Sequence, residues 1–184
     1  MNSPNSMKIT KKTLLFAIIT PCWVIIAVVG LFFASKNAET LFDPTDALYL
    51  AANTPGFSLR VNSILSTALN ASLSNVVVHI SSKKNCLCQF NAKRHISSVK
   101  KAVTDIGKQN ANVFIEEVAG LSDIVTSTPA IAVFDYEGEL SYFGPYSTGI
   151  GCLSGNGSVE PFLDIKSPLG AIVPLESSGC YCAI

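Results

Sequence analysis

Charged residues are scarce in this 184-residue sequence: Asp, Glu, Lys and Arg make up only 14% of it, whereas hydrophobic residues make up 48%. The two signs cancel, and no basic run with interleaved aromatic residues occurs, so a nucleic-acid-binding protein is not expected. No Cys-x-x-Cys pair is followed by histidines at regular spacing, which argues against a structural zinc site. What the sequence does contain is one long uncharged segment, six cysteines and a few clustered charges.

The uncharged segment spans residues 13–35, and as a helix of 23 residues it would be about 34 Å long, enough to cross a bilayer. Lysines precede it, whereas acidic residues follow Lys36, so the positive-inside rule places residues 1–12 in the cytoplasm. We therefore expect a single-pass anchor in the inner (plasma) membrane, with the C-terminal domain on the periplasmic, extracytoplasmic side. A cleaved signal peptide is the alternative, but no clear small-x-small cleavage site follows Phe33.

A buried strand that leads into two cysteines and a helix is predicted in the middle of the chain. Four β-branched residues among positions 76–80 are typical of a strand covered on both faces. From position 96 to 106, apolar residues recur at spacings of three and four, which indicates one face of a helix. Cys86 and Cys88 then fall at the end of the strand and in the first helical turn, where the helix dipole stabilises a thiolate. Four basic residues favour the same ionised form: Lys83, Lys84, Lys93 and Arg94.

The remaining pattern predicts one folded domain behind a tether. We expect helices at 46–52, 58–73 and 159–165, and strands at 112–118, 130–135 and 140–143. The expected organisation is a cytoplasmic N-terminus at 1–12, an anchor at 13–35, a tether at 36–57, a domain at 58–167 and a cysteine-containing tail at 168–184. The tail contains prolines and glycines, so we expect it to be flexible and to stay outside the core.

The cysteines outside the anchor number five and include two Cys-x-Cys pairs. In an oxidising compartment, an odd number favours redox chemistry or metal binding over a purely structural framework. Cys152 follows the strand that is expected to end at Gly144, beside Cys86, so its loop begins within reach of that residue. The tail cysteines, Cys180 and Cys182, have the same reach.

The order of elements resembles the thioredoxin fold. Ser127-Thr128-Pro129-Ala130-Ile131-Ala132-Val133-Phe134-Asp135 looks like the cis-proline strand of that superfamily, and the hairpin through Gly138 to Gly144 looks like the strand after it. The chain also looks like an uncharacterised group of membrane-anchored bacterial thioredoxin-like proteins. The resemblance covers residues 58–166 and implies an α/β domain with a thioredoxin-like central sheet and flanking helices. It further implies a cis bond before Pro129, and a substrate-binding edge formed by Thr128, Pro129 and Gly144.

Three features depart from the thioredoxin pattern. The spacing is Cys-x-Cys instead of Cys-x-x-Cys, and Asn85 replaces the aromatic residue that commonly precedes the first cysteine. The strand before the cysteines carries His79 and no carboxylate. We expect His79 to be a hydrogen-bonded core residue, with a proton relay as the alternative, and we expect His95 on the surface.

The function expected from these features is a membrane-anchored thiol–disulfide oxidoreductase that acts on protein thiols, needs no cofactor and exchanges electrons with a redox partner protein. Cys86 would attack and Cys88 would resolve. In the alternative, Gln89 takes the second position and Cys152, Cys180 or Cys182 resolves.

Two other functions stay open. One is a copper-binding or chaperone module that uses Cys86, Cys88 and His95, because soft thiolates suit Cu(I). The other is a redox-inert binding domain with structural disulfides. For the tail cysteines there are likewise two possibilities. In an oxidoreductase they would exchange disulfides with Cys86 and Cys88, whereas in a structural role Cys180 or Cys182 would be bonded to Cys152.

Overall fold

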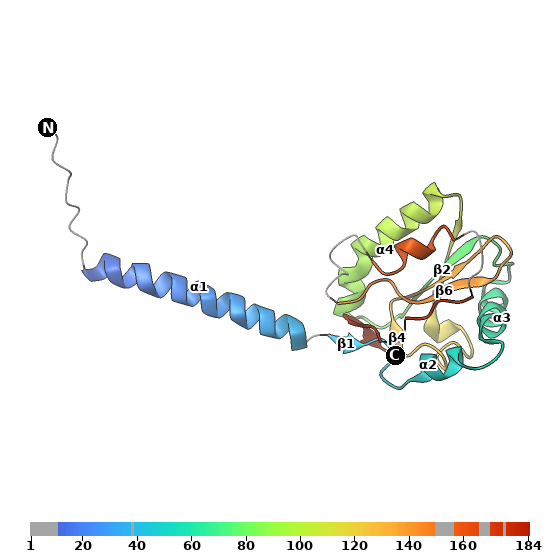
Figure 1. Cartoon of the computed structure of the whole chain (residues 1–184), viewed down its shortest axis with the longest axis horizontal. Helices are drawn as coiled ribbons and strands as arrows, with labels where there is room; N and C mark the ends of the chain where they lie inside the picture. The colour runs from blue at the N-terminus through green and yellow to red at the C-terminus, as the bar shows by residue number, and fades with distance from the viewer. Residues whose placement is uncertain (1–10, 38, 150–156, 166–169, 175) are drawn as a thin grey trace. The chain divides into compact units, whose positions relative to one another are not determined.

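The computed structural model describes residues 11–37, 39–149, 157–165, 170–174 and 176–184 (Figure 1). The chain forms two compact units, Met1–Ala38 and Glu39–Ile184, and each is described by itself.

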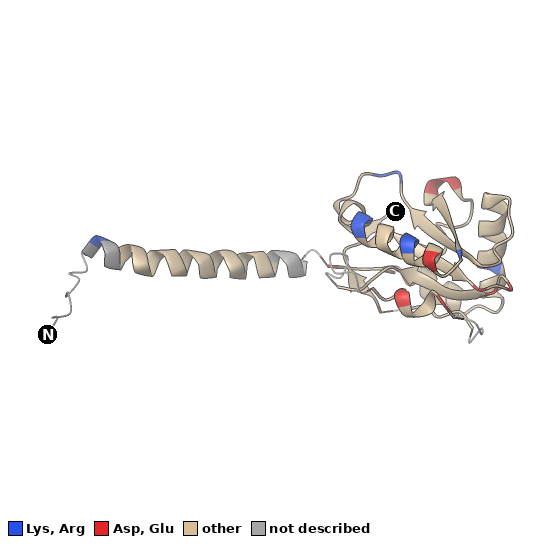
Figure 2. Cartoon of the chain, turned by 90° about the horizontal axis from the view of Figure 1, so that it is seen from above, with Lys and Arg blue, Asp and Glu red and all other residues tan. Residues whose placement is uncertain are grey.

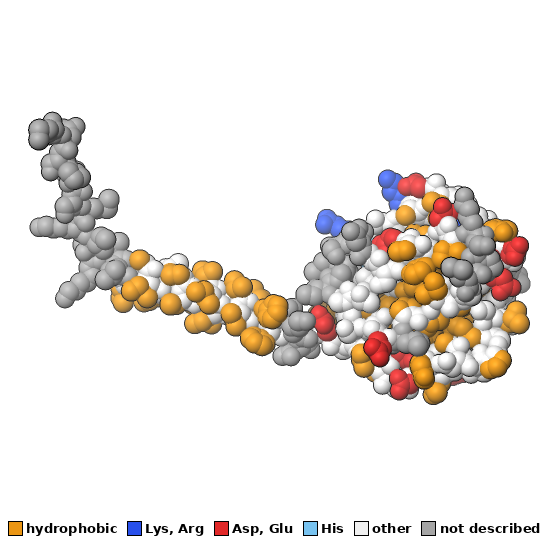
Figure 3. All heavy atoms as spheres, in the orientation of Figure 1, with side chains coloured by type: hydrophobic (Ala, Val, Ile, Leu, Met, Phe, Trp, Pro, Cys, Tyr) orange, Lys and Arg blue, Asp and Glu red, His pale blue; other side chains and the backbone are white. Residues whose placement is uncertain are grey.

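The first unit is the helix α1, Lys11–Asn37. Its segment Leu15–Phe33 has a mean hydropathy of 2.6 and none of its residues is buried, and its hydrophobic surface is plain in Figure 3. At 1.5 Å per residue the 27-residue helix is about 40 Å long, so it is long and apolar enough to span a membrane. Pro21 lies inside the helix, as membrane helices allow.

The second unit is built on a four-stranded sheet in the order β3-β2-β5-β6. In the sheet, β2 (Val76–Ser81) runs parallel to β3 (Gln109–Phe114) and antiparallel to β5 (Ala130–Phe134), and β5 pairs antiparallel with β6 (Leu140–Pro145). The two inner strands, β2 and β5, are buried on both faces, which explains their nearly continuous apolar sequence.

Helices cover the two faces of the sheet (Figure 1). On one face, α2 (Ala47–Ala52), α3 (Phe57–Leu69) and the 3-10 helix η1 (Ile115–Glu117) pack in a core with Val78 and Phe134. On the other, α4 (Leu87–Asp105) packs in a core with Val77 and Val133, beside the 3-10 helix η3 (Glu160–Phe162). Neighbouring residues of a strand thus serve opposite cores, as the alternation of side chains in a strand requires.

The C-terminal residues form two short strands. Ser178–Gly179 (β7) pairs antiparallel with Thr40–Leu41 (β1), and Cys182–Ala183 (β8) pairs antiparallel with Ser127–Thr128 (β4). Tyr181, between them, is buried and donates its hydroxyl to the carbonyl of Ser147 at 2.7 Å. The prediction of a flexible tail outside the core was therefore wrong.

Two other predictions need correction. The strand expected at 112–118 is β3, which begins at Gln109 and ends at Phe114, because the chain turns into η1. The tether expected to reach residue 57 ends earlier, since Phe42 and Leu48 are each only 1% exposed and belong to the core under α3.

Candidate functional site

Two cysteines begin helix α4, as the sequence predicted. Cys86 is the N-cap residue, with extended backbone angles (φ −141°, ψ 136°), and its carbonyl accepts the N–H of Phe90 at 3.1 Å. Cys88 lies in the first helical turn. Both sulfurs are therefore next to the free N–H groups of the helix terminus, where a thiolate is stabilised.

The loop between β2 and α4 is fixed by the side chains of Gln89 and Glu116, a structural role that the sequence did not predict for either residue. Gln89 spans Ser82, because its Nε2 donates to the carbonyl of Ser82 at 2.9 Å and its Oε1 accepts the N–H of Ser82 at 3.1 Å. The Glu116 carboxylate accepts the N–H of Lys83 at 3.0 Å and the hydroxyl of Ser82. That hydroxyl is the main cause that lowers the pKa of Glu116. Neither residue carries a sequence signal for this role.

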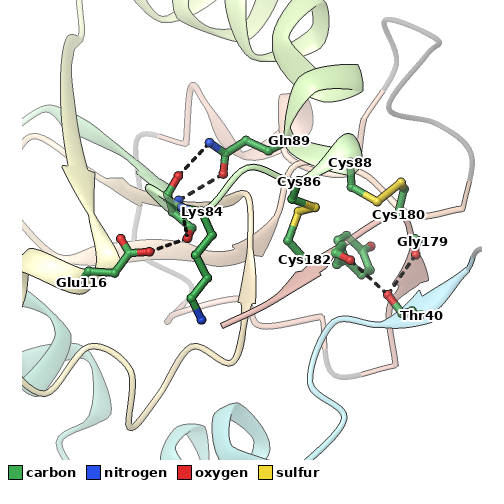
Figure 4. Close-up of a disulfide and its surroundings, with 11 residues drawn as sticks. Thr40, Lys84, Cys86, Cys88, Gln89, Glu116, Gly179, Cys180 and Cys182 are labelled. Atoms are coloured by element: carbon green, nitrogen blue, oxygen red, sulfur yellow. Dashed lines mark hydrogen bonds between the residues drawn. A yellow bond between two sulfur atoms is a disulfide. The ribbon is translucent and has the colours of Figure 1, made fainter.

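Both tail cysteines are bonded to the cysteines of α4. Disulfides join Cys86 to Cys182 and Cys88 to Cys180, with Cα–Cα distances of 6.2 and 5.2 Å (Figure 4). The first cysteine of each Cys-x-Cys pair is thus bonded to the second cysteine of the other pair, so the two segments are antiparallel. The alternative of a structural bond from a tail cysteine to Cys152 is not what the structure has, since both tail cysteines are bonded to α4, and Cys152 itself lies outside the described residues.

Of the residues expected to bind substrate, Thr128 lies next to the Cys86–Cys182 disulfide. The Thr128–Pro129 bond is cis, as predicted. Thr128 is fully buried and pairs across the β4–β8 ladder with Cys182, the residue bonded to Cys86. Gly144 pairs with Ile131 on β5, and a Cβ there would lie 2.8 Å from the ring of Pro174, which gives this glycine a packing role.

The outer side of the site is basic and apolar. Lys83, Lys84 and Lys93 line an open pocket of about 340 Å³ together with Leu87 and Phe90. These two apolar side chains are 79% and 65% exposed. The Lys93 ammonium lies 5.1 Å from the centre of the Phe90 ring. Figure 2 shows the distribution of basic and acidic residues over the domain.

The two histidines are both buried. His79 donates from Nε2 to Asn110 Oδ1 at 2.7 Å and accepts the Tyr146 hydroxyl at Nδ1 at 2.5 Å, which confirms it as a hydrogen-bonded core residue. Burial lowers its pKa to about 4, so it is neutral at physiological pH. His95 is only 2% exposed and its Nε2 contacts Glu160 at 2.6 Å, so the prediction of a surface residue was wrong.

Three sulfurs converge at the site. The Sγ atoms of Cys86, Cys88 and Cys182 all lie within 4.8 Å of one another. After reduction, these three sulfurs would share one small volume. Among the described residues this group contains no histidine, so His95 does not join it.

Residues 57–184 match the profile of one protein family, which is described as a domain of unknown function (DUF6436). No curated protein and no solved structure matches the chain.

Proposed function

This chain belongs to the family described as a domain of unknown function (DUF6436), and since that description names no activity, we propose a function from the geometry of the site. The protein is a membrane-anchored thiol–disulfide oxidoreductase that acts on cysteines of other polypeptides outside the cytoplasm. The helix α1, which is long and apolar enough to cross a membrane, supports the anchor.

The order of strands supports a thioredoxin-like fold and, with it, membership of that superfamily. A cysteine pair follows the parallel strand β2, a cis-proline precedes the antiparallel strand β5, and β6 closes the sheet next to β5. This is the arrangement that the resemblance in sequence implies for residues 58–166.

One observation carries the proposal: the strand that pairs with β4 places a cysteine opposite Thr128, and the sulfur of that cysteine is bonded to Cys86. An extended polypeptide at the same edge would make the same backbone hydrogen bonds and would bring its own cysteine to Cys86. The site is therefore suited to form a mixed disulfide with an extended segment of a substrate.

In the proposed reaction, a substrate thiolate attacks the disulfide at Cys86, bonds to that sulfur and releases the former partner sulfur as a thiolate. A second substrate thiol then attacks the substrate sulfur of this mixed disulfide, which closes a substrate disulfide and leaves Cys86 reduced. The site gains the two electrons and two protons that the substrate loses. In the reverse direction, the Cys86 thiolate attacks a substrate disulfide, and Cys88 resolves the mixed disulfide by attacking Cys86.

The test uses the full chain in detergent micelles. The oxidised protein is mixed with a reduced, unfolded ribonuclease, and the rate of disulfide formation in the ribonuclease is measured. We expect disulfides in the ribonuclease to form faster with the wild-type chain than in buffer alone. This acceleration should be lost in Cys86→Ser and kept in Cys22→Ser, since Cys22 is the free cysteine of α1. The reverse assay, reduction of an oxidised protein by the reduced chain, is run in parallel. A wild-type chain no faster than buffer in both directions would reject the function.

The convergence of three sulfurs favours a second candidate, Cu(I) binding by the reduced site. Thiolates are the ligands that Cu(I) prefers, and Cys182 takes the place expected for His95 beside Cys86 and Cys88. The test is a titration of the reduced chain with Cu(I) against a competing chelator. We expect uptake by the wild type and by Cys22→Ser, and weaker binding in Cys182→Ser. Equal uptake by a Cys86→Ser/Cys88→Ser variant would exclude this site.

A further inference from the structure

The C-terminal residues occupy the edge where the proposed substrate would bind. The strand β8 fills the pairing positions of β4, and the N–H of Ile184 extends the contact by donating to the carbonyl of Thr126 at 3.1 Å. Two disulfides fasten this segment to Cys86 and Cys88 (Figure 4). A second copy of the Cys-x-Cys spacing is thus held against the first.

The two disulfides differ in exposure. Cys182 is buried, with only 7% of its surface exposed, whereas Cys86, Cys88 and Cys180 are each half-buried, so the Cys88–Cys180 bond is accessible from both of its ends. The Cys88–Cys180 bond therefore offers an incoming thiolate the easier approach. Cleaving it would free the Cys88 sulfur, which lies within 4.8 Å of the sulfurs of Cys86 and Cys182.

We propose that Cys180 and Cys182 are a second redox pair, to which the site passes the electrons of its substrate; this inference rests on the proposed oxidoreductase function. A first substrate dithiol reduces the Cys88–Cys180 bond, so that this substrate gains a disulfide and Cys88 and Cys180 become thiols; the attack at Cys86 described above belongs to the next substrate, after the tail has been released. The Cys88 thiolate then attacks the Cys86 sulfur, forms the Cys86–Cys88 bond and releases Cys182 as a thiolate. This second step transfers no net electrons between the protein and its surroundings.

The exchange has two consequences for the site. The electron pair resides on the Cys180–Cys182 dithiol, while α4 keeps a disulfide at Cys86–Cys88. The segment after Ser177 also loses both disulfides and is then held by noncovalent contacts, among them the short ladders with β1 and β4, the hydrogen bond from the Gly149 N–H to the Ser178 carbonyl and the packing of Tyr181. The edge of β4 then becomes available to a substrate strand.

The local charges favour the second step. Lys83, Lys84 and Lys93 line the pocket beside Cys86, and the amino terminus of α4 adds its own positive potential. The helix terminus stabilises a thiolate at Cys88, which lies in the first turn of α4, and the thiolate is the attacking form of a cysteine. The thiol and the disulfide that react belong to one chain, so their effective concentration is high.

The experiment maps disulfides after limited reduction of the oxidised full chain in detergent micelles. One equivalent of a water-soluble phosphine, which reduces one disulfide per chain, is added, the thiols are trapped with an alkylating reagent, and the cysteines are mapped by mass spectrometry. We expect the label on Cys180 and Cys182, with Cys86 bonded to Cys88. Label on Cys88 and Cys180 with Cys86–Cys182 intact, or on Cys86 and Cys182 with Cys88–Cys180 intact, would overturn the proposal.

Two variants make the result independent of the reductant. In oxidised Cys180→Ser, Cys88 has no tail partner, so we expect it to displace Cys182, which becomes accessible to alkylation. In the matched Cys88→Ser variant the displacing thiol is missing, so Cys182 should stay bonded. Equal alkylation of Cys182 in both variants would contradict the exchange. Because the map involves no substrate, a positive map without turnover rejects the proposed function alone, and turnover with a negative map rejects the second redox pair alone.

Discussion

At the scale of single residues, His79 makes the stability of the domain depend on pH. Its pKa is about 4 in the folded chain and near 6.5 in the unfolded chain, because burial disfavours the charged ring. The unfolded state therefore binds more protons between these values, so the contribution of His79 is complete above pH 6.5 and declines as the pH falls towards 4. From this residue we expect unfolding to cost about 2 kcal/mol less at about pH 5 than at neutral pH.

Urea unfolding of the full chain at the two pH values measures this difference. His79→Gln, whose side chain cannot titrate, serves as the control, and its free energy of unfolding should change by about 2 kcal/mol less between the two pH values. An equal change in the free energy of unfolding for the two proteins would show that His79 does not cause the pH dependence.

Gly157 is a second residue whose identity has a packing cause. A Cβ at this position would collide with the carbonyl oxygen of Tyr146 and with Cε1 of His95, and it would lie 2.7 Å from Glu160 Oε2. We expect Gly157→Ala to lower the free energy of unfolding by about 1–3 kcal/mol, the cost of overpacking a filled site. Chemical denaturation measures it, with Gly30→Ala as the control, because nothing lies within 4 Å of a Cβ there. A stability unchanged in Gly157→Ala would refute the close packing.

The positions of the cysteines on α4 were predictable, but their partners were not. The strand pattern before Cys86 and the helical spacing after Cys88 are local signals, and they placed both residues correctly. The bonds to Cys182 and Cys180 join residues 96 and 92 positions apart, a distance over which the sequence shows no periodic signal. The position of His95 was predicted wrongly for a similar reason, since its partner Glu160 lies 65 residues further along the chain.

At the scale of elements, the β2–α4 loop depends on Gln89. Replacing Gln89 by Ala removes both hydrogen bonds to the Ser82 backbone, and we expect a loss of about 1–2 kcal/mol in the free energy of unfolding. Hydrogen exchange at the amide of Ser82 should accelerate locally. Gln109→Ala is the matched control, because Gln109 is exposed on β3. Unchanged exchange at Ser82 in Gln89→Ala would contradict this role.

The C-terminal strands owe much of their stability to the disulfides. The Cys86–Cys182 bond closes a loop with a sequence separation of 96, which corresponds to about 4–5 kcal/mol in a chain-entropy account. The Cys88–Cys180 bond adds less, because the first bond already holds the segments together. We therefore expect the Cys88→Ser/Cys180→Ser variant to remain close to the wild type, and full reduction to cost several times more.

Unfolding in urea with and without reductant measures both effects, and Cys22→Ser controls for the free thiol of α1. A reduced chain as stable as the oxidised one would show that the bonds do not stabilise the fold.

Elements with a strong local pattern were predicted well, and elements made by distant pairing were not. The helix α3, the strand β5 and the hairpin to β6 lie close to their predicted ranges because alternation and helical spacing are visible in the sequence. The two-residue strands β4, β7 and β8 are too short for any pattern and exist only through their pairing.

At the scale of the whole chain, the division into an apolar helix and an α/β unit was predictable from hydropathy and from the alternation of strands and helices. The start of the folded unit was not, because Phe42 and Leu48 lie outside any long periodic segment and become buried only against distant residues. The redox chemistry at Cys86 stays a prediction that the ribonuclease assay addresses, and the thioredoxin-like character of the sheet stays a proposal based on its strand order.

The last prediction concerns the side of the membrane on which the folded unit lies. Lys8, Lys11 and Lys12 precede the apolar segment, so we expect the N-terminus in the cytoplasm and the cysteines outside it. A phosphatase that is active only outside the cytoplasm should be active when fused behind Ile184, through a flexible linker because Ile184 bonds to Thr126. A fluorescent protein that matures only in the cytoplasm, fused at the same place, should stay dark. Replacing the three lysines by glutamines should reduce the bias, and a bright fluorescent fusion with an inactive phosphatase would reverse the orientation and place the site in a reducing compartment.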